Sequence, residues 1–233
     1  MISISENILK LIRPADIATL INALLGFASI IMIFQGMFDS ALVLILLAVI
    51  ADAADGAVAR YSGFGVLGAN LDSLSDAISF GAAPAVAAFV FLIDSRVFAW
   101  FGAGLFLVCG ILRLARFNVA GKKDGFEGIP ITSGGFMVAL FLLAKDYLPD
   151  SYVKPVFVLF IIIISVLMVS TISYPKLKSP VILAPVGILL VLDIMAFYLG
   201  YIELVRPVSL VLFAFVFVYI LSPIGRRIYG RSE

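Results

Sequence analysis

The chain has 233 residues, of which 63% are hydrophobic and 13% are charged, and its mean hydropathy is +1.19. Soluble domains carry about a quarter charged residues, so this composition excludes an ordinary soluble domain and predicts a membrane protein. The 16 Lys and Arg against 15 Asp and Glu leave a net charge of +1, which offers no basic excess for nucleic acid. With only one Cys, the chain forms no internal disulfide. Because it has no His, carboxylates are the side chains left for acid–base catalysis or cation binding.

The N-terminal segment has the pattern of a short amphipathic helix. Isoleucines recur every fourth residue from Ile4 to Ile12 beside charged side chains, which is typical of a helix lying at a membrane interface. Pro14 then turns the chain. We therefore divide the chain into an interfacial helix (1–16), a transmembrane domain (17–222) and a basic cytoplasmic tail (223–233).

Eight apolar segments follow, and each is read as a membrane-spanning helix of about 20 residues. They lie near Ile17–Phe34, Ala41–Ala59, Asn70–Ile93, Val97–Phe117, Thr132–Leu148, Pro155–Thr171, Val181–Ile202 and Val208–Ser222. The apolar runs are continuous rather than alternating, which favours helices over barrel strands. The expected fold is an all-α polytopic bundle of about eight transmembrane helices, and six spans with a buried hairpin would fit nearly as well.

Lys and Arg gather on one side of these spans. The N-terminus and every second connection hold 12 of the 16, and the other four are Arg96, Lys145, Lys154 and Arg206. The positive-inside rule therefore predicts that both termini are cytoplasmic. We expect a multi-pass plasma-membrane protein whose active site faces the cytoplasm.

Four aspartates interrupt the second and third spans. Asp52 and Asp55 are three residues apart, and Asp72 and Asp76 are four apart, so each pair shares one face of its helix. Because the connecting loop is short, the two helices should be antiparallel neighbours, with Asp52 facing Asp76 and Asp55 facing Asp72.

These four carboxylates need counterions. An aspartate at the membrane centre costs roughly 2.5–3.5 kcal/mol, and like charges placed together repel. An oxygen-only site favours magnesium, manganese or calcium over zinc. Two such cations can clamp phosphoryl oxygens, so the segment predicts phosphoryl chemistry at the membrane surface.

The segment from Asp52 to Asp76 reads D-x2-D-G-x2-A-R-x7-G-x3-D-x3-D. It resembles the signature of the CDP-alcohol phosphotransferases, which implies transfer of a phosphatidyl-type group from a CDP-linked lipid to an alcohol, with release of CMP. The resemblance implies that the four aspartates hold two magnesium or manganese ions, with calcium as a non-productive occupant. It also implies that Asp76 is the catalytic base, and a homodimer is expected from the family alone. The residues implied to bind nucleotide or phosphate are Gly56, Ala59, Arg60, Gly68 and Asn22.

A second segment bears on the acceptor. Residues 110–118 read GILRLARFN and residues 126–130 read FEGIP, which together resemble the phosphatidylserine synthase branch of the family. This implies CDP-diacylglycerol or CDP-archaeol as donor and L-serine as acceptor. Because a guanidinium binds a carboxylate bidentately, one of Arg113 and Arg116 would bind serine and the other a lipid phosphate. Asn118 is included in that acceptor or lipid-phosphate site.

Two alternatives remain open. One is a family member with glycerol phosphate or inositol phosphate as acceptor. Because such an acceptor carries a phosphate, its site should contain more basic side chains than Arg113 and Arg116, and the GILRLARFN segment also argues against it. A cation-coupled transporter predicts acids near the midplane and broken helices in two related halves. Here the acids lie toward one membrane surface, and only one half of the chain carries them.

Overall fold

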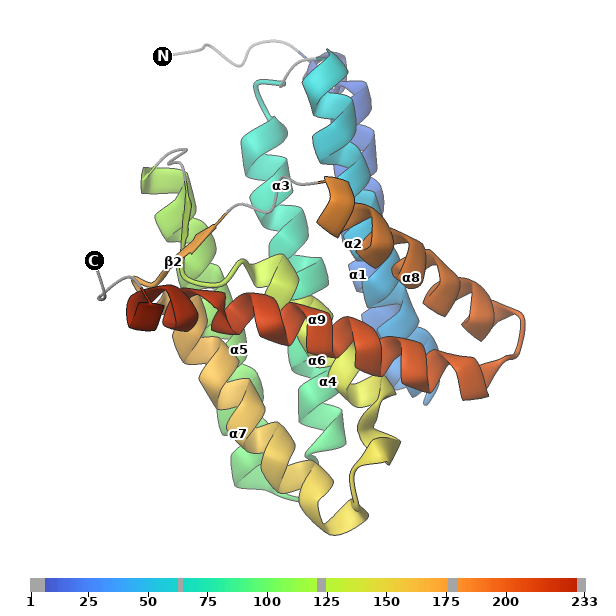
Figure 1. Cartoon of the computed structure of the whole chain (residues 1–233). Coiled ribbons are helices and arrows are strands. Elements are labelled where there is room, and N and C mark those ends of the chain that lie inside the picture. The colour runs from blue at the N-terminus through green and yellow to red at the C-terminus, as the bar shows by residue number, and fades with distance from the viewer. Residues whose placement is uncertain (1–6, 63–64, 121–124, 176–179, 230–233) are drawn as a thin grey trace.

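The computed structural model describes residues 7–62, 65–120, 125–175 and 180–229, and the chain forms a helical bundle (Figure 1). The helices are α1 (Pro14–Phe34), α2 (Phe38–Ser62), α3 (Gly68–Asp76), α4 (Ala83–Phe91), α5 (Arg96–Ala120), α6 (Ile131–Leu143), α7 (Asp150–Val169), α8 (Pro180–Tyr198) and α9 (Ile202–Tyr229). The shorter elements are 3-10 helices at Ile8–Leu11 and Lys145–Tyr147, a π-helical turn at Ala77–Ala82, and strands β1 (Gly125–Glu127) and β2 (Ser173–Pro175).

The predicted fold class is confirmed. Within the described residues, six helical segments are long and apolar enough to cross a membrane, with α3, the π-helical turn and α4 forming one of them. Two further apolar helices are shorter: α6, and residues 183–198 of α8. The chain is therefore a multi-pass membrane protein, and all eight predicted segments are helical.

Helices α7 and α9 begin five and six residues earlier than the sequence predicts, because the expected spans were cut at polar residues such as Lys154 and Arg206. The sixth span was expected to begin at Pro155, but α7 begins at Asp150 and passes through this proline. The eighth was expected to begin at Val208, but α9 begins at Ile202 and contains Pro207. Each proline is the sixth residue of its helix, so its ring removes a backbone hydrogen bond close to the helix start. Membrane helices tolerate such a loss where neighbours satisfy the freed carbonyl.

The expected terminal segments also differ from the structure. Of the predicted interfacial helix, the described part contains only the 3-10 helix Ile8–Leu11, and α1 already begins at Pro14; residues 1–6 lie outside the described part. At the other end, α9 continues to Tyr229, so the expected boundary between residues 222 and 223 falls inside a helix.

Helix α1 packs closely against the π-helical turn that follows Asp76. A Cβ atom added at Gly26 would lie 2.5 Å from the Cα of Ser79, so only glycine permits this approach. The Ser79 hydroxyl donates to the carbonyl of Asn22 at 2.7 Å, one turn earlier on α1. These contacts fix α1 beside the helix that carries two of the aspartates.

Helix α6 lies at the centre of the bundle, where all of its residues except Thr132 and Ser133 are buried. Helix α9 packs against α6 and α8, and Figure 1 shows it crossing the other helices steeply. Between α8 and α9, the buried Asp193 accepts a hydrogen bond from Ser209 at 2.7 Å. The antiparallel pair β1 and β2 joins the α5–α6 connection to the α7–α8 connection.

Candidate active site

Three of the predicted aspartates, which come from α2 and α3, meet beside α1, against which both helices pack. Asp52, Asp72 and Asp76 each offer a carboxylate oxygen, and these oxygens lie within 4.8 Å of one another. Asp76 is only 6% exposed, and the other two are half-buried. Carboxylates held this close repel one another, so the cluster requires nearby positive charge.

Arg113 of α5 supplies part of that charge. Its side chain is buried and interacts electrostatically with Asp76, Asp72 and Asp52. Its guanidinium carbon lies 5.4 Å from the ring centre of Phe117, one turn further along α5. One arginine among three carboxylates leaves two negative charges. Oxygen donors with this residual charge fit a divalent cation such as magnesium, manganese or calcium.

Asp55 lies beside this cluster and has a different partner. Its carboxylate accepts a hydrogen bond from the Thr19 hydroxyl of α1 at 2.8 Å, while it repels both Asp72 and Asp76. Asp55 and Asp72 line a cavity of about 450 Å³. The other residues of the cavity wall are Ala15, Asp16, Thr19, Gly56, Gly65, Gly68, Ala69, Phe117 and Asn118.

Two glycines of this cavity, Gly65 and Gly68, lie next to a buried carboxylate that sequence reasoning missed. Asp16 accepts a hydrogen bond from the backbone N–H of Arg13 at 2.8 Å and is 2% exposed. A Cβ added at Gly65 or Gly68 would lie 3.0 or 3.4 Å from an Asp16 oxygen. Asp16 sits in the first turn of α1, a position where acidic residues commonly stabilise helices, so its sequence pattern indicates only a helix start. Two further predicted residues, Ala59 and Arg60, have side chains outside the described part of the structure.

Asn22 and Thr132 reach the aspartates from α1 and α6. The Asn22 amide donates to Asp76 at 3.5 Å, and its buried amide oxygen has no hydrogen-bond partner among the residues that the structure describes. The Thr132 side chain lies beside the carboxylate of Asp52. Sequence reasoning singled out Asn22 but missed Thr132 and Thr19, because an isolated threonine in an apolar helix gives no functional signal.

The two arginines of α5 have different surroundings. The Arg116 guanidinium donates to main-chain carbonyls at the end of α7, namely those of Met168 (3.3 Å), Val169 (3.2 Å) and Ser170 (2.9 Å). It also donates to the carbonyl of Glu127 in β1. The last carbonyls of a helix lack partners within the helix, so Arg116 satisfies them and ties α5 to both α7 and β1. Its predicted contact with serine or lipid phosphate stays a prediction.

Comparison with known proteins decides the family. The model of the CDP-alcohol phosphatidyltransferase family matches residues 13–212. The chain belongs to this family. The matched region contains α1 to α8, all four aspartates of the signature, and both arginines of α5.

Several relatives of this chain carry names that include serine. It is 39% identical over 146 residues to the archaetidylserine synthase of Methanothermobacter thermautotrophicus, an alignment covering 61% of this chain and 63% of that protein. It is 38% identical over 147 residues to the CDP-diacylglycerol–serine O-phosphatidyltransferase of Methanocaldococcus jannaschii, covering 62% and 68%. The Saccharomyces cerevisiae protein of the same name is 34% identical over 143 residues, covering 54% and 51%. The chain thus spans about half to two thirds of the length of these relatives.

Proposed function

We propose that the protein is a serine phosphatidyltransferase. It takes a CDP-linked lipid, either CDP-diacylglycerol or CDP-archaeol, transfers the phosphatidyl-type group to the hydroxyl of L-serine, and releases CMP. The observation that carries the proposal is the cluster of Asp52, Asp72 and Asp76 beside the buried Arg113. The names of the relatives support serine and a CDP-linked lipid as the two substrates.

The aspartates would hold two divalent cations, magnesium or manganese, with calcium as a non-productive occupant. Asp52, Asp72 and Asp76 offer converging oxygens, and Asp55 adds a fourth carboxylate on the wall of the adjoining cavity. When bound, such cations neutralise charge on the diphosphate and on the oxygens that attack and leave. The carboxylates outnumber the one arginine that interacts with them, which supports the binding of cations here, and the diphosphate of the donor would add further negative charge.

The cavity of about 450 Å³ would receive the cytidine diphosphate part of the donor. Its size lies within the range of roughly 300–1,000 Å³ typical of ligand sites. Gly56 and Gly68 line it and let a ligand approach the backbone. We keep Ala59 and Arg60 in this site by the family motif. We also keep Asn22 in this site by the resemblance; its buried amide oxygen has no hydrogen-bond partner among the described residues.

The transfer requires one proton acceptor and one in-line displacement. The serine hydroxyl oxygen attacks the phosphorus that carries the lipid, and the bond from that phosphorus to the CMP oxygen breaks. Asp76 takes the hydroxyl proton, because its buried carboxylate lies within the cluster and is oriented by the Asn22 amide. Arg113 binds the serine carboxylate or the lipid phosphate. Asn118, which lines the cavity and accepts a hydrogen bond from Ser73 at 3.0 Å, borders the same site.

The placement in the cell is also a proposal. The distribution of Lys and Arg supports a transmembrane domain over residues 17–222 whose termini and active site face the cytoplasm. We propose the plasma membrane as its location and a homodimer as its assembly, the latter from family membership.

The decisive experiment uses purified protein and a panel of acceptors. The protein is incubated with a CDP-linked lipid, magnesium or manganese, and either L-serine, glycerol phosphate or inositol phosphate, and CMP release is measured. We expect CMP and a serine phospholipid with L-serine alone. Faster release with a phosphorylated acceptor would change the acceptor, and no release with any of the three would refute transferase activity with these acceptors.

A further inference from the structure

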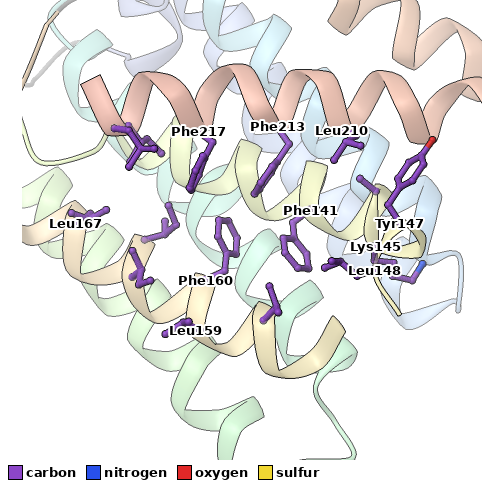
Figure 2. Close-up of a pocket in the computed structure, with 16 residues that line it drawn as sticks. Phe141, Lys145, Tyr147, Leu148, Leu159, Phe160, Leu167, Leu210, Phe213 and Phe217 are labelled. Carbon is purple, nitrogen blue, oxygen red and sulfur yellow. The ribbon is translucent and has the colours of Figure 1, made fainter. Parts of the chain in front are cut away.

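A second cavity lies between α6, α7 and α9 and is almost entirely apolar. It has a volume of about 710 Å³, and four phenylalanine rings form much of its wall (Figure 2). The rings pack on one another, with centroids 5.2 Å apart for Phe141 and Phe160 and 5.5 Å apart for Phe160 and Phe213. The active-site aspartates and the arginines of α5 are not among the described residues that line it. This groove is therefore separate from the proposed active site.

The groove has one polar end. Figure 2 shows the Lys145 ammonium and the Tyr147 hydroxyl at that end and Leu167 at the other. Lys145 lies 3.6 Å from Asp146, whose carboxylate has a closer partner in Arg206 at 2.8 Å. The ammonium and the phenol thus present hydrogen-bond donors where the apolar lining begins, which complements a phosphate joined to a hydrocarbon chain.

This polar end lies away from the aspartates. Thr132, in the first turn of α6, contacts Asp52, whereas Lys145 follows the other end of α6. Helix α6 has 13 residues, so its two ends are about 20 Å apart at 1.5 Å per residue. The donors of the groove therefore lie toward the membrane surface opposite to the aspartate cluster.

The length of the groove suits one lipid chain. Its α7 wall extends from Val156 to Leu167, which is about 17 Å at 1.5 Å per residue. This is close to half of the roughly 30 Å hydrocarbon core of a bilayer. A chain that begins beside Lys145 would lie along this wall within about one leaflet.

The lining favours a flexible chain over a helix of a second copy. Membrane helices that pack together place small residues at their contact. Here Ala144 is the one small residue among the described lining residues, and bulky aliphatic side chains such as Leu159 and Ile163 project from α7. A hydrocarbon chain can follow such a surface, whereas a helix backbone would be held away from it.

We propose that this groove binds one chain of a membrane phospholipid from the leaflet opposite to the aspartate cluster, with the lipid phosphate held by Lys145 and Tyr147. The bound chain covers the apolar wall between α7 and α9 and stabilises their packing. This lipid is distinct from the proposed substrate, because its headgroup lies at the other membrane surface.

Native mass spectrometry of the delipidated full chain in detergent tests the headgroup contact. The probes are dioleoylphosphatidylglycerol and dioleoylglycerol, which share their chains and differ in the phosphate. We expect tighter binding of the phospholipid, and about fivefold weaker phospholipid binding by Lys145→Gln, from the contribution of one lysine near an anionic surface. Lys154→Gln is the matched control, because Lys154 lies near the start of α7, pairs with Asp94 and does not line the groove; it should bind as the wild type does.

A substitution that fills the groove with a larger side chain tests whether a lipid hydrocarbon chain lies in it. Leu159→Trp should abolish the phospholipid adduct, whereas Val191→Trp, on an exposed part of α8 outside the groove, should retain it. Elution as a single species in size-exclusion chromatography, together with an unfolding transition in detergent without added lipid, establishes that each variant is folded. If Leu159→Trp does not fold, the comparison of Lys145→Gln with Lys154→Gln decides.

Three results would overturn the proposal. One is equal affinity of the wild type and Lys145→Gln for the phospholipid, and another is an undiminished adduct in folded Leu159→Trp. The third is conversion of a dimer to a monomer by Leu159→Trp with unchanged lipid binding, which would make the groove a subunit interface.

Discussion

Gly26 determines how closely α1 approaches the helix that carries Asp72 and Asp76. A Cβ at this position would meet Ser79 at 2.5 Å, whereas ordinary van der Waals contact begins at 3.4 Å, so Gly26→Ala would displace α1 by about 0.9 Å. Overpacking of this kind costs roughly 1–3 kcal/mol. Asn22 lies one turn before Gly26 and contacts Asp76 at 3.5 Å, so the same shift disturbs the active site. A misplacement of about 1 Å there lowers the rate on the order of 100-fold.

The assay pairs CMP release with thermal unfolding in detergent. We expect Gly26→Ala to lower both kcat and the unfolding temperature. Gly104→Ala is the matched control, because a Cβ at Gly104 of α5 would meet no atom within 4 Å. Alanine also favours a helix more than glycine does, so this control should match or slightly exceed the wild type. Wild-type stability and kcat in Gly26→Ala would refute the argument that this close approach positions the site.

Four other substitutions separate the roles assigned to the site. Asp76→Asn should lower kcat by about 10²–10⁴-fold, because the amide cannot take the serine proton, while binding of the CDP-linked lipid, measured by heat protection, is kept. Asp52→Ala should abolish magnesium-dependent heat protection by that lipid. Arg113→Lys should raise the KM for serine more than the KM for the CDP-linked lipid in steady-state kinetics, because the bidentate geometry is lost. Arg116→Lys should lower the free energy of unfolding by about 1.5–3 kcal/mol, because hydrogen bonds from the charged guanidinium to main-chain carbonyls are lost. Its effect on the KM for serine should be smaller than that of Arg113→Lys.

Each of these expectations has a contrary result. Full turnover by Asp76→Asn would remove it as the base, and metal-dependent protection in Asp52→Ala would remove it as a ligand. Equal effects of the Arg113 and Arg116 variants on the KM for serine would contradict the different roles that their contacts indicate.

The aspartate site could be predicted because it depends on the spacing of residues that are close together in the sequence. Asp72 and Asp76 share a helix face, and the short loop after α2 returns them to the depth of Asp52. The positions of the eight helices follow equally from the need for long apolar segments in a bilayer. Both inferences use only distance along the chain.

What the sequence does not reveal depends on contacts between distant segments. Arg113 and Arg116 are three residues apart in the same motif, yet one faces the aspartates and the other the end of α7. Thr132 reaches Asp52 only because α6 is packed into the centre of the bundle. The start of α7 was expected at Pro155 because Lys154 interrupts the apolar segment, but α7 includes Lys154, whose side chain pairs with Asp94.

The π-helical turn after Asp76 bears on how related chains should be aligned. Such a turn closes its hydrogen bonds over five residues instead of four, so it holds one residue more than a turn of α-helix. The additional residue is accommodated within the turn, and the polar face of α3 and the buried face of α4 keep the directions that an uninterrupted helix would give them. A homologue that lacks one residue between Ala77 and Ala82 can therefore close this segment as an ordinary α-helix, with its acidic residues and its buried side chains in the same directions.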